Sequence, residues 1–197
     1  MRTARALAVA LLAPIGLATT DPEPAPADAS APEPAVESEL VEWALERFHA
    51  AGLELPNDIV VSFHGDDQPC EGNHGTYRPG EPDRVRICRH DPDPEIQDQL
   101  RRHALLHELA HAWTDHELER DRRDAFLELR GATTWSNREV AWHDRGTEQA
   151  AEIITWGLLD REVGFLNIRD TRCDQLRAGY VTLTGVEPTA GLEHSCS

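Results

Sequence analysis

Residues 105–113 read LLHELAHAW, and this apolar stretch with three polar side chains decides how the rest of the chain is interpreted. His107 and His111 are four residues apart, so a helix places both imidazoles on one face, one turn apart. Two ring nitrogens at that spacing can reach one zinc ion at about 2.0–2.1 Å. Glu108 lies about 100° around the helix from His107, where it can reach a metal-bound water without acting as a ligand. Two ligands and a base on one turn indicate metal-assisted hydrolysis.

The apolar surroundings of the motif favour a metal site over an incidental pair of histidines. Burying two histidines and a glutamate in an apolar helix costs free energy unless they find partners. His103 extends the same helix face by one more turn. We expect His103 to be exposed or to support the site without binding the metal.

A catalytic zinc site needs a third protein ligand. A histidine six residues past His111 would supply it locally, but Glu117 stands there. The helix predicted over 147–159 offers Glu148 and Glu152 on one face, and spacing alone leaves both open. Glu148 lies in the first turn, where the helix N-terminus favours a negative charge, so we expect it to be the third ligand. Glu152 is then expected to hold a ligand histidine, and it remains the alternative ligand.

Capping and periodicity predict the elements around the motif. Asp93 and Pro94 are a capping residue and a first-turn proline, so the motif helix is expected from Pro94 to about His116. Charged and apolar residues alternate over 84–88, as in an edge strand, whereas 65–80 reads as a loop because it is rich in Asp, Gly and Pro. A further strand is expected at 59–63 and further helices at 41–51, 120–130, 147–159 and 172–183. A small sheet followed by helices predicts the α+β class.

The N-terminal residues are expected to lie outside the folded domain. Arg2 and Arg5 precede a short apolar run that ends in small residues, which is typical of a secretory signal peptide over 1–20. The run is too short to span a membrane comfortably, so the mature protein is expected to be secreted and free of the membrane. Residues 21–38 alternate proline with Asp, Glu and Ala and read as a tether. The domain is expected to cover 39–197.

The chain has four cysteines: Cys70, Cys88, Cys173 and Cys196. An even number in an exported chain predicts two disulfides, with three possible pairings. We favour Cys70–Cys88 and Cys173–Cys196, because pairs close in sequence would close loops that lack other support. A four-cysteine zinc site is disfavoured, since it would be expected to contain a Cys-x-x-Cys pair.

The charge balance excludes two classes of partner. The chain has 19 basic residues, all arginine, against 36 acidic ones, which gives a formal net charge of −17. Nucleic-acid binding needs a basic surface that displaces counterions, and docking on anionic lipid needs the same sign of charge. The 40% hydrophobic content and the mean hydropathy of −0.52 are typical of a soluble protein.

The HELAH sequence at 107–111, followed by ExxAE at 148–152, resembles the gluzincin branch of the zincin metallopeptidases. The resemblance implies a secreted zincin-like metallopeptidase domain that binds Zn²⁺ and hydrolyses peptide bonds of a peptide or protein substrate with a zinc-activated water. It also implies roles for five residues: zinc ligands His107, His111 and Glu148, general base Glu108, and Glu152 holding a ligand histidine. The alternative is a secreted binding protein of zincin fold in which the zinc is structural and nothing is cleaved.

Substrate contacts are less specified by the sequence. The strand expected at 84–88 precedes the motif helix and could align an extended substrate by main-chain pairing. A tetrahedral oxyanion needs a donor besides the metal. The sequence offers four candidates without distinguishing them: Tyr77, His143, Arg145 and Tyr180.

Overall fold

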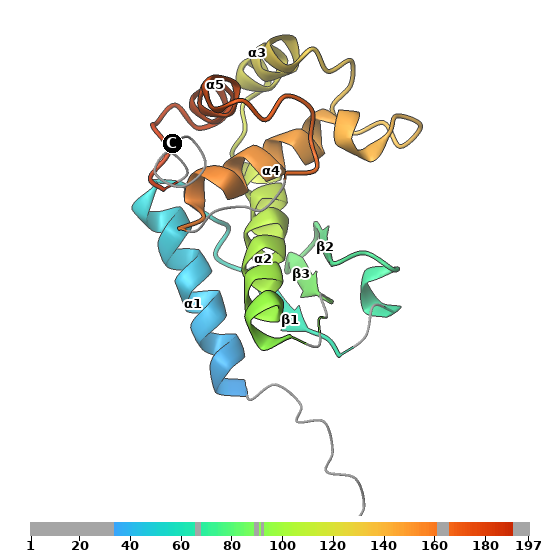
Figure 1. Cartoon of the computed structure of the whole chain (residues 1–197), viewed down its shortest axis with the longest axis vertical. Helices are drawn as coiled ribbons and strands as arrows, with labels where there is room; N and C mark the ends of the chain where they lie inside the picture. Colours follow the sequence, from blue (N-terminus) through green and yellow to red (C-terminus); the bar gives the residue numbers. More distant parts are fainter. Residues whose placement is uncertain (1–33, 66–67, 89–90, 92, 161–165, 191–197) are drawn as a thin grey trace, which may run out of the picture. The chain divides into compact units, whose positions relative to one another are not determined.

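The computed structural model describes residues 34–65, 68–88, 91, 93–160 and 166–190. These residues form three short strands and a larger set of helices, in the α+β order that the sequence predicts (Figure 1). The elements are α1 (Pro34–Ala50), β1 (Val60–Phe63), η1 (Gln68–Cys70), β2 (Gly75–Arg78), β3 (Arg84–Ile87), α2 (Pro94–His116), α3 (Arg120–Arg130), η2 (Trp142–Asp144), α4 (Gly146–Leu158) and α5 (Cys173–Thr184), where η marks a short 3₁₀ helix.

The sheet is mixed, with the strand order β1-β3-β2. β1 runs parallel to β3, and β2 runs antiparallel to it. The prediction that 84–88 forms an edge strand is therefore wrong, because β3 is flanked on both sides. Val85 and Ile87 are buried, while Arg84 is exposed and Arg86 donates to a main-chain carbonyl. A central strand can carry arginines when only one face of its sheet packs on the core.

The true edge strand next to the motif helix is β2, which falls inside the predicted loop 65–80. Its four residues Gly-Thr-Tyr-Arg pair with β3 in the register Gly75↔Ile87 to Arg78↔Arg84. β2 also contacts α2. The sheet edge beside the motif helix is therefore β2, and not the strand predicted at 84–88.

The motif helix α2 forms as predicted. The Asp93 carboxylate accepts hydrogen bonds from the main-chain N–H groups of Glu95 and Ile96, with Pro94 in the first turn. The helix ends at His116. Its middle, from Ala104 to Ala110, is buried, because α2 contacts β2, β3, α1 and α4 (Figure 1).

The second site-bearing helix is α4, which is buried along nearly its whole length. Ala150 and Ala151 are fully buried, and α4 packs more extensively against α2 than against any other element. A Cβ on Gly146 would lie 2.5 Å from Leu127 Cδ2, so the glycine permits the close approach of α3. α5 contacts both α3 and α4.

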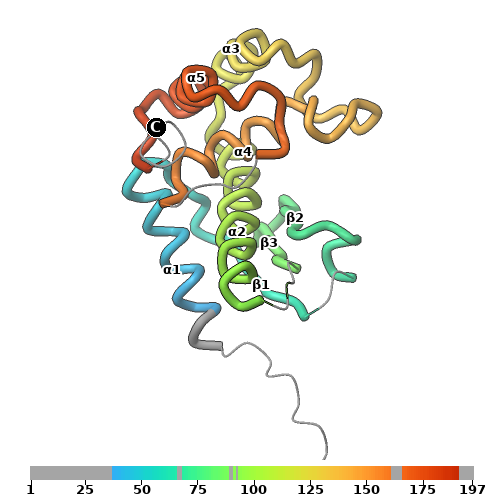
Figure 2. Tube along the Cα trace, viewed as in Figure 1, coloured from blue at the N-terminus to red at the C-terminus, as the bar shows by residue number. Residues whose placement is uncertain are grey.

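The remaining helices end within about one residue of the expected positions. α3 covers 120–130 and ends at Gly131, whose φ of 61° is left-handed. α5 covers 173–184. α1 ends at Ala50 as expected but begins at Pro34, so the last residues assigned to the tether are helical. Figure 2 follows the chain from α2 through α3 and back along α4, which brings residues far apart in sequence together.

Cys70 and Cys88 form a disulfide, as predicted, with a Cα–Cα distance of 6.0 Å. Cys173 is also disulfide-bonded, and its expected partner Cys196 lies outside the described residues. Disulfides are typical of proteins that fold in an oxidising compartment.

Among the described residues, no helix combines the length and the apolar character that crossing a bilayer requires. The predicted signal peptide, 1–20, lies outside the described residues, and the division of the chain into leader, tether and domain remains a prediction.

Candidate metal centre

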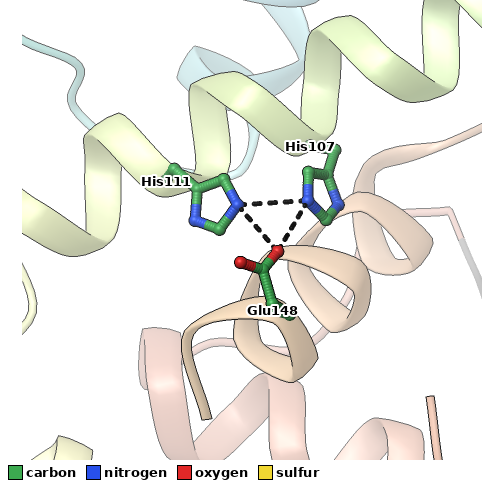
Figure 3. A group of neighbouring side chains, drawn as sticks. All are labelled: His107, His111 and Glu148. Atoms are coloured by element: carbon green, nitrogen blue, oxygen red, sulfur yellow. Dashed lines mark hydrogen bonds and ion pairs between the residues drawn. The ribbon is translucent and has the colours of Figure 1, made fainter. Parts of the chain in front are cut away.

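His107, His111 and Glu148 meet where α2 crosses the start of α4 (Figure 3). The Nε2 atoms of the two histidines are 3.1 Å apart. Glu148 Oε2 lies 3.4 Å from His107 Nε2 and 3.2 Å from His111 Nε2. The side chains are 9 to 14% exposed. The predicted histidine pair and the predicted third residue therefore converge on one point inside the protein.

The geometry of this group fits a zinc ion. Ligand atoms about 2.0–2.1 Å from a tetrahedral zinc are about 3.3–3.4 Å from one another. The three observed separations, 3.1 to 3.4 Å, lie close to that value. Two imidazoles and one carboxylate are also a donor set that catalytic zinc sites use, with a fourth position left for water or substrate. The three residues could therefore hold a metal ion, and their chemistry suits zinc.

The electrostatics of the group call for a positive charge at the same point. Burial lowers the pKa of His107, but the neighbouring carboxylates, Glu148 first, outweigh burial and raise it to about 9. Burial raises the pKa of Glu148, yet hydrogen bonds from His107 and His111 bring it well below its usual range. A metal ion would supply the charge that a proton on His107 otherwise provides.

Glu152, one turn further along α4, does not join the three converging atoms. Its Oε1 lies 3.5 Å from His107 Nδ1, and its Oε2 lies 3.1 Å from His103 Nε2. The carboxylate is 4% exposed. Burial raises its pKa, but the hydrogen bond from His103 and the charges of His107 and His103 together lower it below its ordinary value. Glu152 therefore lies beside His103 and His107, and its expected supporting role stays a prediction.

Two further contacts to the histidines were not predicted from the sequence. Thr147 Oγ1 lies 3.3 Å from His111 Nδ1, the ring nitrogen that does not face His107 and Glu148. The Trp142 ring from η2 stacks on the His107 ring, with centroids 5.7 Å apart and an angle of 18°. Thr147 directly precedes Glu148 in the sequence, so its contact with His111 could have been anticipated. Nothing in the sequence indicates the contact between Trp142 and His107.

Glu108 lies beside the group on the sheet side of α2. It is 7% exposed, and its side chain packs against Gly75 of β2. Burial raises its pKa, and the histidines and a hydrogen bond from the main chain of Tyr77 offset part of that rise. A buried carboxyl group with a raised pKa, next to a candidate metal site, is suited to accept and return a proton.

All these residues line one open cleft of about 1640 Å³. Its walls come from β2 and the residues before it, from one face of α2, from η2 and from the start of α4. The cleft is large enough to admit a peptide segment, and the metal-binding atoms face it.

The four candidate oxyanion donors differ in whether a substrate could reach them. Tyr180 is fully buried, so it is inaccessible to a substrate. The Tyr77 hydroxyl is hydrogen-bonded to Asp83 and Asp115. Arg145 lines the cleft and donates to the main-chain carbonyls of Val140 and Arg138, while His143 lies 3.6 Å from Asp144.

Comparison with known proteins gives no further guide, since no family model, no curated protein and no solved structure matches the chain. The fold is α+β, and the structure contains a buried group that could bind a metal ion.

Proposed function

We propose that the protein is an exported zinc-dependent peptidase. The observation that carries the proposal is the convergence of His107, His111 and Glu148 on one point of a large cleft, with Glu108 beside them. A purely structural zinc site is usually closed by four protein ligands, whereas a catalytic site keeps one position open. Three ligand residues that face a cleft favour catalysis.

A zinc ion held there would act as a Lewis acid that activates water and polarises a carbonyl group. Glu108 accepts a proton from the attacking water as the water oxygen bonds to the peptide carbon. It then delivers that proton to the amide nitrogen as the C–N bond breaks. Thr147 orients the His111 imidazole through its second ring nitrogen, and Glu152 places a negative charge 3.5 Å from His107 Nδ1. Both leave the ring nitrogens that face the cleft available for the metal.

The edge of β2 is suited to align an extended substrate, a role that the sequence had placed on 84–88. The Cys88 N–H donates to the His74 carbonyl, so His74 and Thr76 direct their main-chain groups toward β3. Gly75 and Tyr77 alternate with them and direct theirs away from β3, where the main chain of Tyr77 already donates to the Glu108 carboxylate. Because β2 lines the cleft, a peptide there can pair with this edge and bring its carbonyl to the site.

Export is supported by the disulfide Cys70–Cys88 and by the signal-like sequence at 1–20. N-terminal sequencing of the protein recovered from the culture medium of a secreting host tests this. A mature N-terminus just after the apolar run supports export, and an intact Met1 in cell-retained protein contradicts it.

Glu108→Ala tests the peptidase directly, because Glu108 is not expected to hold the metal. The wild type should cleave members of a random peptide pool, and a chelator should abolish the cleavage. Glu108→Ala should retain its zinc and lose at least about 100-fold in activity. A wild type that binds zinc but cleaves nothing would favour the alternative, a non-catalytic binding protein.

A further inference from the structure

Gly75, the first residue of β2, lies directly against Glu108. A Cβ built on Gly75 would be 2.7 Å from Glu108 Cγ, 2.8 Å from Oε1 and 3.1 Å from Cδ. Contacts below 3.0 Å are essentially never made by real Cβ atoms. Glu108 therefore occupies the space that a side chain at position 75 would need.

The main chain does not require glycine at this position. The glycines with left-handed φ are Gly52, Gly72, Gly131 and Gly185 in the described chain, and Gly75 is not among them. Gly75 instead sits in regular strand pairing opposite Ile87, which any residue can adopt. A side chain at position 75 is therefore excluded by lack of space and not by the backbone conformation.

Glu108 lies between β2 and the cleft. It is 7% exposed, its Cγ lies against Gly75, and it lines the cleft. The main chain of Tyr77, two residues along the same strand, hydrogen-bonds to its carboxylate. Cγ, the atom nearest to the missing Cβ, moves only by rotation about the first side-chain torsion, and that rotation carries the carboxylate with it.

We propose that Gly75 is a positioning residue for the general base: its bare Cα lets the Glu108 side chain lie against β2 and fixes where the carboxylate faces the metal ligands. This inference rests on the proposed role of Glu108. A side chain at position 75 displaces the carboxylate while leaving His107, His111 and Glu148 in place, since the atoms nearest to its Cβ all belong to Glu108. The edge strand thereby sets the geometry of proton transfer as well as bordering the cleft.

The first test compares Gly75→Ala with Gly65→Ala, in which the added methyl group meets nothing within 4 Å. Gly75→Ala should lower kcat by about 100-fold, because a misplacement of about 1 Å at a reacting group can cost that much. KM and zinc content should stay within twofold of the wild type. Gly65→Ala should leave kcat, KM and zinc content unchanged. A kcat for Gly75→Ala within twofold of the wild type would overturn the proposal.

The second test works without turnover, so it separates this proposal from the proposed function. Gly75→Ala is introduced into the wild type, into Glu108→Gln and into Glu108→Ala, and Tm is measured for each pair. Glutamine keeps the shape of Glu108, so the methyl group should lower Tm as much as in the wild type. Glu108→Ala removes Cγ, so in that background Gly75→Ala should lower Tm much less. The same Tm shift in all three backgrounds would show that Gly75 does not act through Glu108.

If no variant cleaves any peptide, the proposed function fails and the Tm cycle alone decides whether Gly75 positions the Glu108 side chain. If the wild type cleaves peptides and Gly75→Ala loses its zinc, the glycine supports the metal site instead, and the proposal is overturned.

Discussion

The helix pair α2–α4 and the cleft wall formed by β2 and η2 contribute to the site in different ways. The helix pair carries His107, His111 and Glu148 on buried segments whose spacing is fixed by regular helices. The cleft wall contributes mainly bare main chain at Gly75 and a stacked ring at Trp142. Metal binding should therefore depend on the helix pair, whereas turnover should need Glu108 and the metal on the helix pair as well as the cleft wall. Changes in the cleft wall should leave metal binding intact.

The largest effect is expected in the helix pair, at Glu148. Glu148→Ala should remove most zinc, because it deletes one of three ligand atoms. Glu152→Ala should weaken zinc binding by about 10- to 100-fold, because it removes the carboxylate 3.5 Å from His107 Nδ1 but none of the three converging atoms. Zinc content and competition with a chromophoric chelator measure both. The assignment is reversed if Glu152→Ala loses the zinc and Glu148→Ala keeps it.

Metal affinity should also depend on pH, because the metal replaces a proton on His107. The pKa of His107 is raised to about 9 in the metal-free protein, above its ordinary 6.5. The proton therefore stabilises the metal-free fold fully below pH 6.5, and this contribution is lost as pH rises through about 9. Metal binding releases that proton, so apparent affinity should rise by about tenfold per pH unit between 6.5 and 9. A flat chelator-competition curve over this range would show that no such proton is displaced.

The cleft wall should respond to loss of the disulfide between Cys70 and Cys88. The bridge holds the segment from Glu71 to His74, which lines the cleft, to the end of β3. Replacing both cysteines by serine should lower the free energy of unfolding by about 3 kcal/mol, according to the chain-entropy model. KM should rise while zinc content and helical circular dichroism stay near the wild type at room temperature. Loss of zinc in parallel with activity would mean that the wall and the helix pair are not separable.

The smallest effect is expected at Thr147, whose hydroxyl lies 3.3 Å from His111 Nδ1. Thr147→Val keeps the shape of the side chain and removes the hydrogen bond. Zinc affinity should fall by about tenfold, the lower end of the range for groups that orient a ligand. Unchanged affinity would assign the orientation of His111 to packing alone.

The helix pair was predictable because its signals are local. The cap at Asp93 and Pro94 fixed the start of α2, and four-residue spacing placed His107 and His111 on one face. Glu148 and Glu152 could be ranked by their position in the first turn of α4. Only the contacts made outside the three converging atoms, such as those of Glu152 with His103 and His107, could not be inferred without the packed structure.

The cleft wall was not predictable, because its strand has no local pattern. Gly75, Thr76, Tyr77 and Arg78 lack apolar alternation, and their pairing with β3 is what makes them a strand. The arginines of β3 led us to expect an edge strand. They are compatible with a central strand because Arg84 is exposed even there. Trp142 reaches His107 only after α3 has turned the chain back, so no spacing in the sequence encodes that contact.

The metal centre is tested most directly by an anomalous diffraction map of crystals grown with zinc, recorded above and below the zinc absorption edge. We expect one strong peak bounded by His107 Nε2, His111 Nε2 and Glu148 Oε2, and its loss in Glu148→Ala. A map without a peak at that point, or with zinc held only by other residues, would contradict this expectation.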